Sequence, residues 1–555
     1  MRAKEKMIRI ARTLRPIGAR QLWAQGVYAL RGLRPPPPLL GPVPELSPGG
    51  EPAAFLPAPR HARWVSPDAL ELIQRRVDFS AGVDWGHSAE GPLWLYHLNQ
   101  CDHLRDEELS PERRRDLMLD WVRTCSAGAG WDPHPTCLRV LSWGKLLLTP
   151  GAVELTPGEA GEIRGSMAQQ LDGLERNLEF RLQANHLLAN LIGLVFGGLL
   201  FEGPRADAWL QREEDLRAEL ARQFGREGAH EERSPMYHAL LLENLLDLLN
   251  LLRVREERAP RPLAEELAAT AERALAALSV WRHPDGEIAL FGDSALGIAP
   301  PPDALLEYGR ALGLQPLAPE TPGLLASAGF ARLEEGPFAL LASFGVPSPA
   351  HQPGHAHCDA LSFELTCAGE RVVCDTGVHS YEPGPRRDVA RATRSHATLE
   401  IAGAEQSEIW AAHRVGGRVR TALVAFEPRA SLEATCASWS TPDTLHRRRF
   451  SLAGGVLEIR DWVEGVPRAV RLALPLAPGL EPRLVHDQEG GTEAHVRLAG
   501  SGRLRVILPV EVNWRIERIP YYPEFGIEAD RACLVGEAEA FESGCWRFEF
   551  SPEGE

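Results

Sequence analysis

The sequence predicts a multidomain α+β protein with an N-terminal α/α toroid, that is, an incomplete helical barrel, and a C-terminal antiparallel β-sandwich. Residues 62–314 carry long Leu-, Ala-, Glu- and Arg-rich segments with the 3.6-residue period of helices. From Gly329 onward the chain shows short alternating segments separated by Gly-rich turns. The pattern changes near residues 316–323, which predicts a helical domain over 61–320 and a sandwich over 325–555.

The helical domain is expected to consist of long helices joined by short Gly and Pro turns. Successive antiparallel pairs of such helices close most readily into a bundle or a toroid. The most apolar window, Leu187–Phe201, has 15 residues and includes Asn190, whereas a membrane-spanning helix needs about 20 apolar residues. We therefore expect a buried helix there and no transmembrane span. The predicted helices cover residues 113–125, 159–181, 186–200, 206–223, 234–254 and 262–281.

The sandwich is expected to be built from short strands at regular spacing, the pattern of antiparallel all-β domains. Nine cysteines are scattered through the chain without a CxxC pair, so a disulfide framework is not expected. The predicted strands cover residues 338–344, 361–367, 371–375, 397–401, 418–426, 448–452, 456–463, 470–474, 494–498 and 504–508.

Residues 1–60 differ from the rest of the chain. Residues 1–34 contain nine Lys or Arg residues and the single acid Glu5, and Pro35–Pro38 open a Pro/Gly-rich linker that runs to about residue 59. Arginines interrupt every apolar run in residues 1–34, so we do not expect this segment to be a standard signal peptide. The basic leader is either a solvated helix or a helix in peripheral contact with an anionic membrane.

Composition and charge narrow the class of protein. The chain has 555 residues, of which 44% are hydrophobic and 25% charged, values typical of globular proteins. The formal net charge is -16, whereas a nucleic-acid binder of this size would usually be basic. We therefore expect no nucleic-acid partner.

The densest cluster of metal-capable side chains lies in residues 351–359 and continues downstream. His355 and His357 would point to the same face of an extended strand, because side chains alternate along it. Imidazoles and a carboxylate are a common ligand set for Zn²⁺, and His357, Asp375 and His396 on neighbouring strands would supply three ligands. The alternative is that these histidines only make hydrogen bonds within a sheet.

A second polar cluster occurs at predicted helix starts. Asn185 and His186 open the apolar helix, and Tyr237 lies in the first turn of another. Asn185 could act only as an N-cap, and Tyr237 could be a core residue. Helix starts also place amide dipoles at a domain rim, where an anion can bind.

These motifs resemble a known family. The C-terminal set is Gly354–Asp359, Asp375–Gly377, Tyr381, Arg391 and Ser395–Leu399, and the helical set is Asn185–His186, Ser234–His238 and His283–Glu287. In content and order they resemble the heparinase II/III-like polysaccharide lyases over most of residues 90–550. Ala397 departs from the family pattern, which often has Asn at that position.

The resemblance implies cleavage of an acidic, uronate-containing polysaccharide, such as a glycosaminoglycan or an alginate-like polymer, by β-elimination. Asn185 would hold the uronate carboxylate, and His186 and His355 would neutralise charge or carry protons. Tyr237 would be the base, the acid that protonates the leaving oxygen, or both. Elimination builds negative charge beside a carboxylate, so donors aimed at that charge supply much of the catalysis.

The resemblance also implies that Zn²⁺ at His357, Asp375 and His396 is structural, and that the protein resides in the cell envelope or periplasm. The missing signal peptide leaves a cytoplasmic location as the alternative. An ordinary tyrosine titrates near pH ~10, so a basic Tyr237 would need a nearby cation. Candidate cations for this role are Arg139, Arg233 and His238, and the arginines that could attract an acidic glycan to the cleft are Arg386, Arg387, Arg391 and Arg394.

Two other functions stay open at this stage. A zinc-dependent glycan hydrolase would use metal-bound hydroxide and release products without a double bond. A non-catalytic glycan-binding protein that assists exopolysaccharide biosynthesis would account for the basic leader and the missing export signal.

Overall fold

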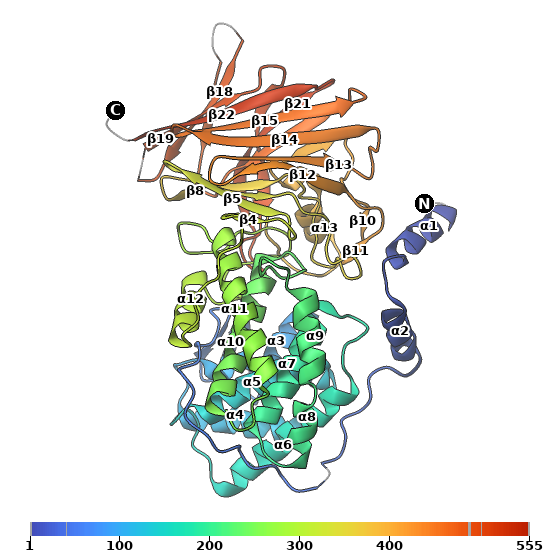
Figure 1. The fold of residues 1–555 in the computed structure, drawn as a ribbon, viewed down its shortest axis with the longest axis vertical. Coiled ribbons are helices and arrows are strands. Elements are labelled where there is room, and N and C mark those ends of the chain that lie inside the picture. The colour runs from blue at the N-terminus through green and yellow to red at the C-terminus, as the bar shows by residue number, and fades with distance from the viewer. Residues whose placement is uncertain (1–2, 40, 487–489, 501, 553–555) are drawn as a thin grey trace.

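The computed structural model describes all residues except 1–2, 40, 487–489, 501 and 553–555. A helical domain and a β domain are stacked along the long axis of the molecule, and an N-terminal arm runs beside both (Figure 1). The arm consists of helices α1 (Ala3–Leu14) and α2 (Ala19–Arg31). The Pro/Gly-rich segment that follows is extended and packs on the helical domain, where the Ala53 backbone N–H donates to the Asn250 side-chain oxygen.

The helical domain is the predicted incomplete toroid. Prolines stand in the first turn of many of its helices, where their fixed φ suits the helix and their missing N–H costs nothing. Helix α7 packs against α5, α6, α8, α9 and α10, so all its residues except His186 are buried. The helices are α3 (Pro92–Gln100), α4 (Pro111–Thr124), α5 (Pro133–Leu148), α6 (Pro157–Arg176), α7 (Ala184–Leu200), α8 (Pro204–Leu210), α9 (Glu213–Gln223), α10 (Pro235–Val254), α11 (Arg261–Trp281) and α12 (Pro302–Ala311).

Three details of the helical domain differ from the sequence prediction. The predicted helix over 206–223 is divided into α8 and α9 at Gln211–Arg212. Residues 62–78 form a three-stranded sheet, β1 (Ala62–Ser66), β2 (Ala69–Leu72) and β3 (Arg75–Asp78), instead of helix. Helices α3, α5 and α12 were not among the predicted helices, and α5 is buried on most of its circumference, so it shows no amphipathic period.

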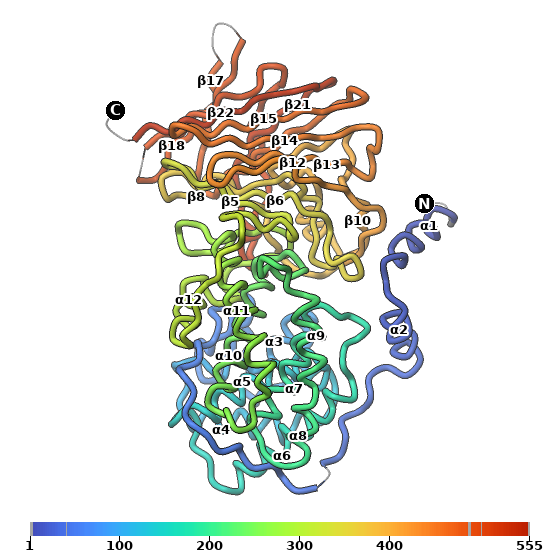
Figure 2. The backbone as a smooth tube through the Cα atoms, viewed as in Figure 1, coloured from blue at the N-terminus to red at the C-terminus, as the bar shows by residue number. Residues whose placement is uncertain are grey.

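The β domain contains antiparallel sheets of eight, five and four strands and a two-stranded hairpin. The eight-stranded sheet has the order β12-β13-β14-β15-β22-β19-β18-β17, the four-stranded sheet β20-β21-β16-β9, and the five-stranded sheet β4-β5-β6-β7-β8. Apolar side chains from these sheets form one core, which includes Phe363, Leu472 and Phe548. The tube trace in Figure 2 shows the five-stranded sheet on the side that faces the helices.

The strands have the following bounds: β4 (Leu324–Leu325), β5 (Phe330–Glu335), β6 (Phe338–Ser343), β7 (Phe363–Cys367), β8 (Glu370–Val373), β9 (Leu399–Ile401), β10 (Ile409–Trp410), β11 (Arg414–Val415), β12 (Arg420–Glu427), β13 (Ser431–Ala437), β14 (Thr444–Ala453), β15 (Val456–Gly465), β16 (Val470–Pro475), β17 (Pro482–His486), β18 (Thr492–Leu498), β19 (Gly502–Leu508), β20 (Asn513–Tyr521), β21 (Ala529–Ala538) and β22 (Ser543–Pro552). A short helix, α13 (Pro385–Arg391), follows β8.

A separate apolar cluster joins the two domains. Trp281 at the end of α11 and Phe291 in the loop after it pack with Phe330 of β5, and all three side chains are buried. This contact fixes the position of the loops that reach from the sheets toward the helix starts. Within the described residues, no helix is both long enough and apolar enough to cross a membrane.

Candidate active site

A cavity of about 590 Å³ lies between the two domains. Its helical wall comes from the starts of α7 and α10, and its opposite wall from loops of the β domain. The cavity therefore collects side chains from both halves of the chain. The amide, imidazole and phenol side chains in its lining include Asn185, His186, Tyr237, His355, Tyr381 and His413.

Asn185 is fixed by a buried carboxylate. Its side-chain amide donates to both carboxylate oxygens of Glu232 at 2.8 Å, and its backbone N–H also reaches Glu232. The two preceding residues, Gln183 and Ala184, have positive φ angles of 59° and 47°, a strained conformation for residues other than glycine. Asn185 lies inside α7 and does not cap it, so the capping interpretation of this residue is wrong.

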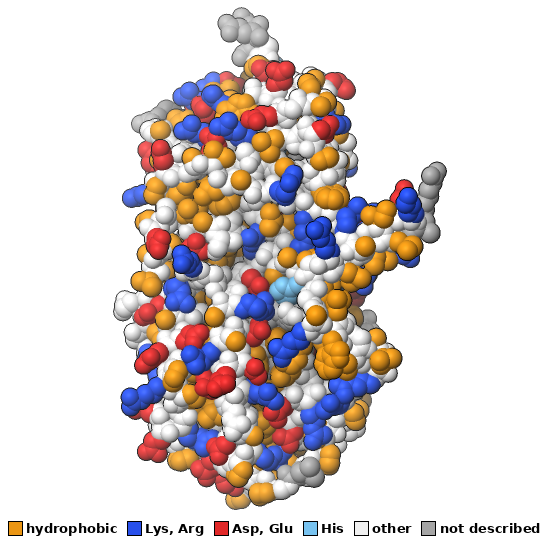
Figure 3. Space-filling view, turned by 45° about the vertical axis from the view of Figure 1, so that its right-hand side comes forward, with side chains coloured by type: hydrophobic (Ala, Val, Ile, Leu, Met, Phe, Trp, Pro, Cys, Tyr) orange, Lys and Arg blue, Asp and Glu red, His pale blue; other side chains and the backbone are white. Residues whose placement is uncertain are grey.

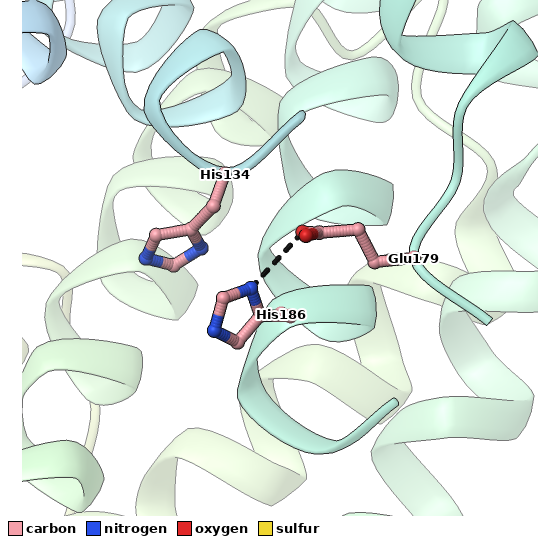
Figure 4. Close-up of side chains that lie close together, drawn as sticks. All are labelled: His134, Glu179 and His186. Atoms are coloured by element: carbon pink, nitrogen blue, oxygen red, sulfur yellow. Dashed lines mark hydrogen bonds and ion pairs between the residues drawn. The ribbon is translucent and has the colours of Figure 1, made fainter. Parts of the chain in front are cut away.

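His186 stands beside Glu179 and His134 (Figure 4). The ring Nδ1 of His186 is 3.1 Å from the buried Glu179 carboxylate, and the His134 and His186 ring centroids are 4.3 Å apart. Burial alone would lower the pKa of His186, but the charge and hydrogen bond of Glu179 raise it above its usual value. Burial and the His186 charge lower the pKa of His134 to about 3. The pKa values of these two neighbouring imidazoles are therefore shifted in opposite directions.

The same three residues could also hold a metal ion. Ligand atoms of His134, Glu179 and His186 lie within 4.8 Å of one another. His134 and His186 line the cavity and Glu179 lies buried behind them, so an ion held by the two imidazoles would be within reach of a ligand.

Tyr237 faces two β-domain side chains across the cavity. Its hydroxyl is 2.8 Å from the Tyr381 hydroxyl, and its ring centroid is 4.1 Å from that of His355. Burial raises the pKa of Tyr237 well above its usual value, and the hydrogen bond with Tyr381 offsets only part of this rise. Tyr237 is therefore a neutral phenol in the resting protein.

Asp293 links two histidines of the β domain to a buried arginine. It lies in the loop after α11, and its carboxylate accepts from His355 Nδ1 and His357 Nε2, both at 2.9 Å. Arg387 of α13 pairs with both carboxylate oxygens and is fully buried. Burial alone would raise the pKa of Asp293, but Arg387 and the two imidazoles hold it well below its usual value. Because Nδ1 of His355 donates to Asp293, its Nε2 is left to accept a proton.

Gly292 makes this arrangement possible. Its φ is +57°, and a Cβ atom there would come within 2.9 Å of the His355 carbonyl oxygen. The close approach lets the Asp293 backbone N–H donate to that carbonyl at 3.0 Å. The Asp293 loop is thereby tied to the His355 loop through both backbone and side chain.

None of the three cations proposed for Tyr237 from the sequence acts on it. Arg139 is buried against Trp121 and donates to Gln170. Arg233 donates to the backbone carbonyls of Val346 and Ser327. His238 donates to the backbone carbonyl of Ala274. Burial lowers the pKa of His238 to about 4, so it is neutral. Arg387 is the cation near the tyrosine pair, with its guanidinium 5.4 Å from the Tyr381 ring centroid.

The arginines proposed to attract an acidic glycan have other roles. Arg387 and Arg391 are buried, and Arg391 donates to backbone carbonyls of residues 356, 411 and 412. Arg386 pairs with Glu528, and Arg394 lies near Glu400. Three of the four arginines therefore pair with a carboxylate, and the buried Arg391 donates to backbone carbonyls instead.

The candidate metal ligands His357, Asp375 and His396 are brought together and fully buried. They lie in loops beyond the strand ends and not on neighbouring strands, as the sequence prediction had placed them, because His357 precedes β7, Asp375 follows β8 and His396 precedes β9. His396 Nδ1 is 3.0 Å from both Asp375 oxygens. Within the described structure, Nδ1 of His357 and Nε2 of His396 are buried without a hydrogen-bond partner. Such orphaned ring nitrogens beside a carboxylate fit a Zn²⁺ ligand set.

Sequence reasoning missed Glu179, Glu232 and Asp293. Each is separated from its partner by a different distance along the chain, from seven residues for Glu179 and His186 to 62 for Asp293 and His355. The sequence offered one signal that could have pointed to such a residue, namely an acid in an otherwise apolar or Gly-rich stretch, as in Phe291–Ser294.

Comparisons with known proteins agree with this architecture. The helical toroid and the antiparallel sheets border one cavity that is lined by amide, phenol and imidazole groups. The family models Heparinase II/III N-terminus and Heparinase II/III-like, C-terminal match residues 162–299 and 318–527. The chain therefore belongs to the heparinase II/III-like family.

Solved structures share the fold over most of the chain. A crystal structure of Heparinase III is 17% identical, with a TM-score of 0.65, and the match covers 85% of this chain and 80% of that one. The heparan sulfate lyase HepC from Pedobacter heparinus is 18% identical, with a TM-score of 0.58, and the match covers 89% of this chain and 82% of that one. A comparison with curated proteins found no match.

Proposed function

We propose that this protein cleaves a uronate-containing acidic polysaccharide by β-elimination. One observation carries the proposal: Asn185 and Tyr237 from the helical domain and His355 from the β domain line a single cavity, with the Tyr237 and His355 rings 4.1 Å apart. Family membership and the fold shared with heparan sulfate lyases support it. Incubation with uronate polymers, followed by ultraviolet detection of unsaturated ends, tests it.

The carboxylate of the sugar would bind at the start of α7. The Asn185 amide is held in place by Glu232, and the His186 imidazolium supplies a positive charge nearby. Together they would counter the charge that builds on the carboxylate as the C5 proton leaves, and a site organised beforehand does this without reorganisation.

His355 and Tyr237 would move the two protons. His355 accepts the C5 proton at Nε2, because Asp293 holds a proton on Nδ1. The C4–O bond then breaks, the Tyr237 hydroxyl protonates the leaving oxygen, and a C4–C5 double bond forms. The raised pKa of Tyr237 suits an acid that is protonated before the reaction. Tyr381 donates to the phenolate that results, and the adjacent His355 returns a proton to it.

Zn²⁺ at His357, Asp375 and His396 would be structural. When bound, it would link three loops of the β domain beneath the cavity. His357, Asp375 and His396 are buried and none of them lines the cavity, which is consistent with a role in holding these loops together. The cavity-facing cluster of His134, Glu179 and His186 keeps metal-assisted hydrolysis as the second candidate function.

We expect loss of the zinc site to destabilise the protein. His396→Ala should abolish zinc in the purified protein by elemental analysis and lower the melting temperature by at least about 5 °C, given ~2–4 °C per kcal/mol for a domain of this size. The matched control His495→Ala changes a half-exposed histidine on β18 and should alter neither quantity. Equal zinc contents in the two variants would refute the assignment.

The pH dependence should report the Glu179–His186 pair. Because Glu179 raises the pKa of His186, the imidazolium persists to higher pH than a free histidine and is lost as the pH rises through the raised value. Glu179→Gln should therefore move the alkaline limb of kcat/KM to lower pH. Glu175→Gln, which removes a surface partner of Arg212, should leave the profile unchanged. An alkaline limb that does not move in Glu179→Gln would show that His186 does not set it.

A further inference from the structure

The N-terminal arm exposes an unusual share of apolar surface. Among the described residues, the most exposed large apolar side chains include Leu30, Trp23 and Met7, with exposed fractions of 91%, 71% and 70%. A folded soluble protein rarely leaves several such side chains together in water, and a patch of this kind usually marks a binding surface. Figure 3 shows the arm projecting from the body with apolar and cationic side chains along it.

The polar side of each arm helix is attached to the body. Arg9 and Arg12 of α1 both pair with Glu408 just before β10, and the Trp410 indole donates to Thr13. On α2, the side chains of Gln21 and Gln25 donate to the carbonyl oxygen of Arg181. The arm is thus fixed on both domains through its polar residues.

The apolar side of each helix therefore faces outward. Met7 and Leu14 are seven residues apart on α1, as are Trp23 and Leu30 on α2, and that spacing places each pair on one face. At 100° per residue these faces lie opposite Arg9 and Gln21 respectively. Ordinary surface helices have the reverse arrangement, with the apolar side on the protein.

Cations flank this apolar face. Four exposed cations lie on the arm helices or directly after α1, namely Lys4, Lys6, Arg15 and Arg31. The first 34 residues carry nine Lys or Arg residues, although the whole chain has a net charge of -16. An apolar stripe with a tryptophan and flanking cations has the chemistry of a helix that lies in the interface of an anionic bilayer.

We propose that α1 and α2 bind the surface of an anionic phospholipid membrane and hold the two-domain body beside it. Met7, Leu14, Trp23 and Leu30 would enter the boundary between headgroups and acyl chains, and the exposed cations would contact the lipid phosphates. A symmetric contact between two copies of the arm would place like charges together, which favours lipid over a second copy as the occupant.

Vesicle flotation of the full-length protein tests this proposal. The protein should float with vesicles of phosphatidylcholine and phosphatidylglycerol, should not float with phosphatidylcholine alone, and should be released by high salt. The double variant Trp23→Ser and Leu30→Ser should weaken vesicle binding by at least about tenfold, because it removes two large apolar side chains from the lipid-facing side of α2. These side chains are exposed, so the melting temperature should not change.

The matched control changes two exposed apolar residues of the β domain, Val466→Ser and Val510→Ser, and should leave vesicle binding unchanged. Failure of the wild-type protein to float with the anionic vesicles would overturn the proposal. So would equal binding by the two double variants. A dimer in solution that the Trp23 and Leu30 substitutions convert to monomer, without any vesicle binding, would assign the surface to a second copy instead.

Discussion

Tyr237→Phe should lower kcat by about 10²–10⁴, the usual contribution of a positioned acid–base group. The substitution removes the hydroxyl that we propose protonates the leaving oxygen, and it keeps the ring that packs against His355. Substrate binding rests on other groups, so KM should change little. The rate is measured as the increase in ultraviolet absorbance that accompanies the C4–C5 double bond.

Tyr381→Phe is the matched control for this variant. It removes the other hydroxyl of the same 2.8 Å hydrogen bond, so both variants leave one phenol without its partner. We expect a smaller loss of kcat, because Tyr381 would only stabilise the Tyr237 phenolate. Equal rates for wild type and Tyr237→Phe would remove Tyr237 from the mechanism, and a larger loss in Tyr381→Phe would exchange the two roles.

Asp293→Asn should destabilise the protein by about 3–5 kcal/mol, the usual cost of leaving a buried charge without its partner. The Arg387 guanidinium is fully buried and would keep only carbonyl partners, those of Ala412 and Gly354. Activity should fall as well, because His355 would lose the carboxylate that fixes its tautomer. Chemical denaturation of the full chain measures the first effect, and the elimination assay measures the second.

Asp285→Asn provides the comparison for a surface pair. Asp285 pairs with Arg371, but its side chain is 37% exposed, so the loss should not exceed about 1 kcal/mol. If both variants lost the same stability, Asp293 would not be the electrostatic link between the two histidines and α13.

The fold was largely predictable because periodicity is a local property. The long apolar faces of helices α10 and α11 can be seen directly in the sequence. The same is true of the apolar positions in strands β15 and β16. Helix α5 was missed for the opposite reason, since a helix surrounded by others needs no polar face. The strands at residues 62–78 are too short to be distinguished from the start of a helix by pattern alone.

The site was predictable only in part. The residues that face the cavity, Asn185, His186, Tyr237 and His355, occur in motifs that resemble the family and could be named from the sequence. The carboxylates that orient them could not, because Glu232 and Asp293 reach their partners only after distant loops meet in the folded chain. The true cation near the tyrosines, Arg387, was one of several arginines with no local feature to distinguish it.

The products of glycan cleavage show directly whether this protein acts by elimination or by hydrolysis. The purified protein should be incubated with a panel of uronic-acid polymers, and the products examined by ultraviolet absorbance and by mass. For a lyase we expect new ultraviolet absorbance and fragments whose masses show no uptake of water. Fragments that each incorporate one water, without new absorbance, would contradict elimination and establish hydrolysis in the same cavity.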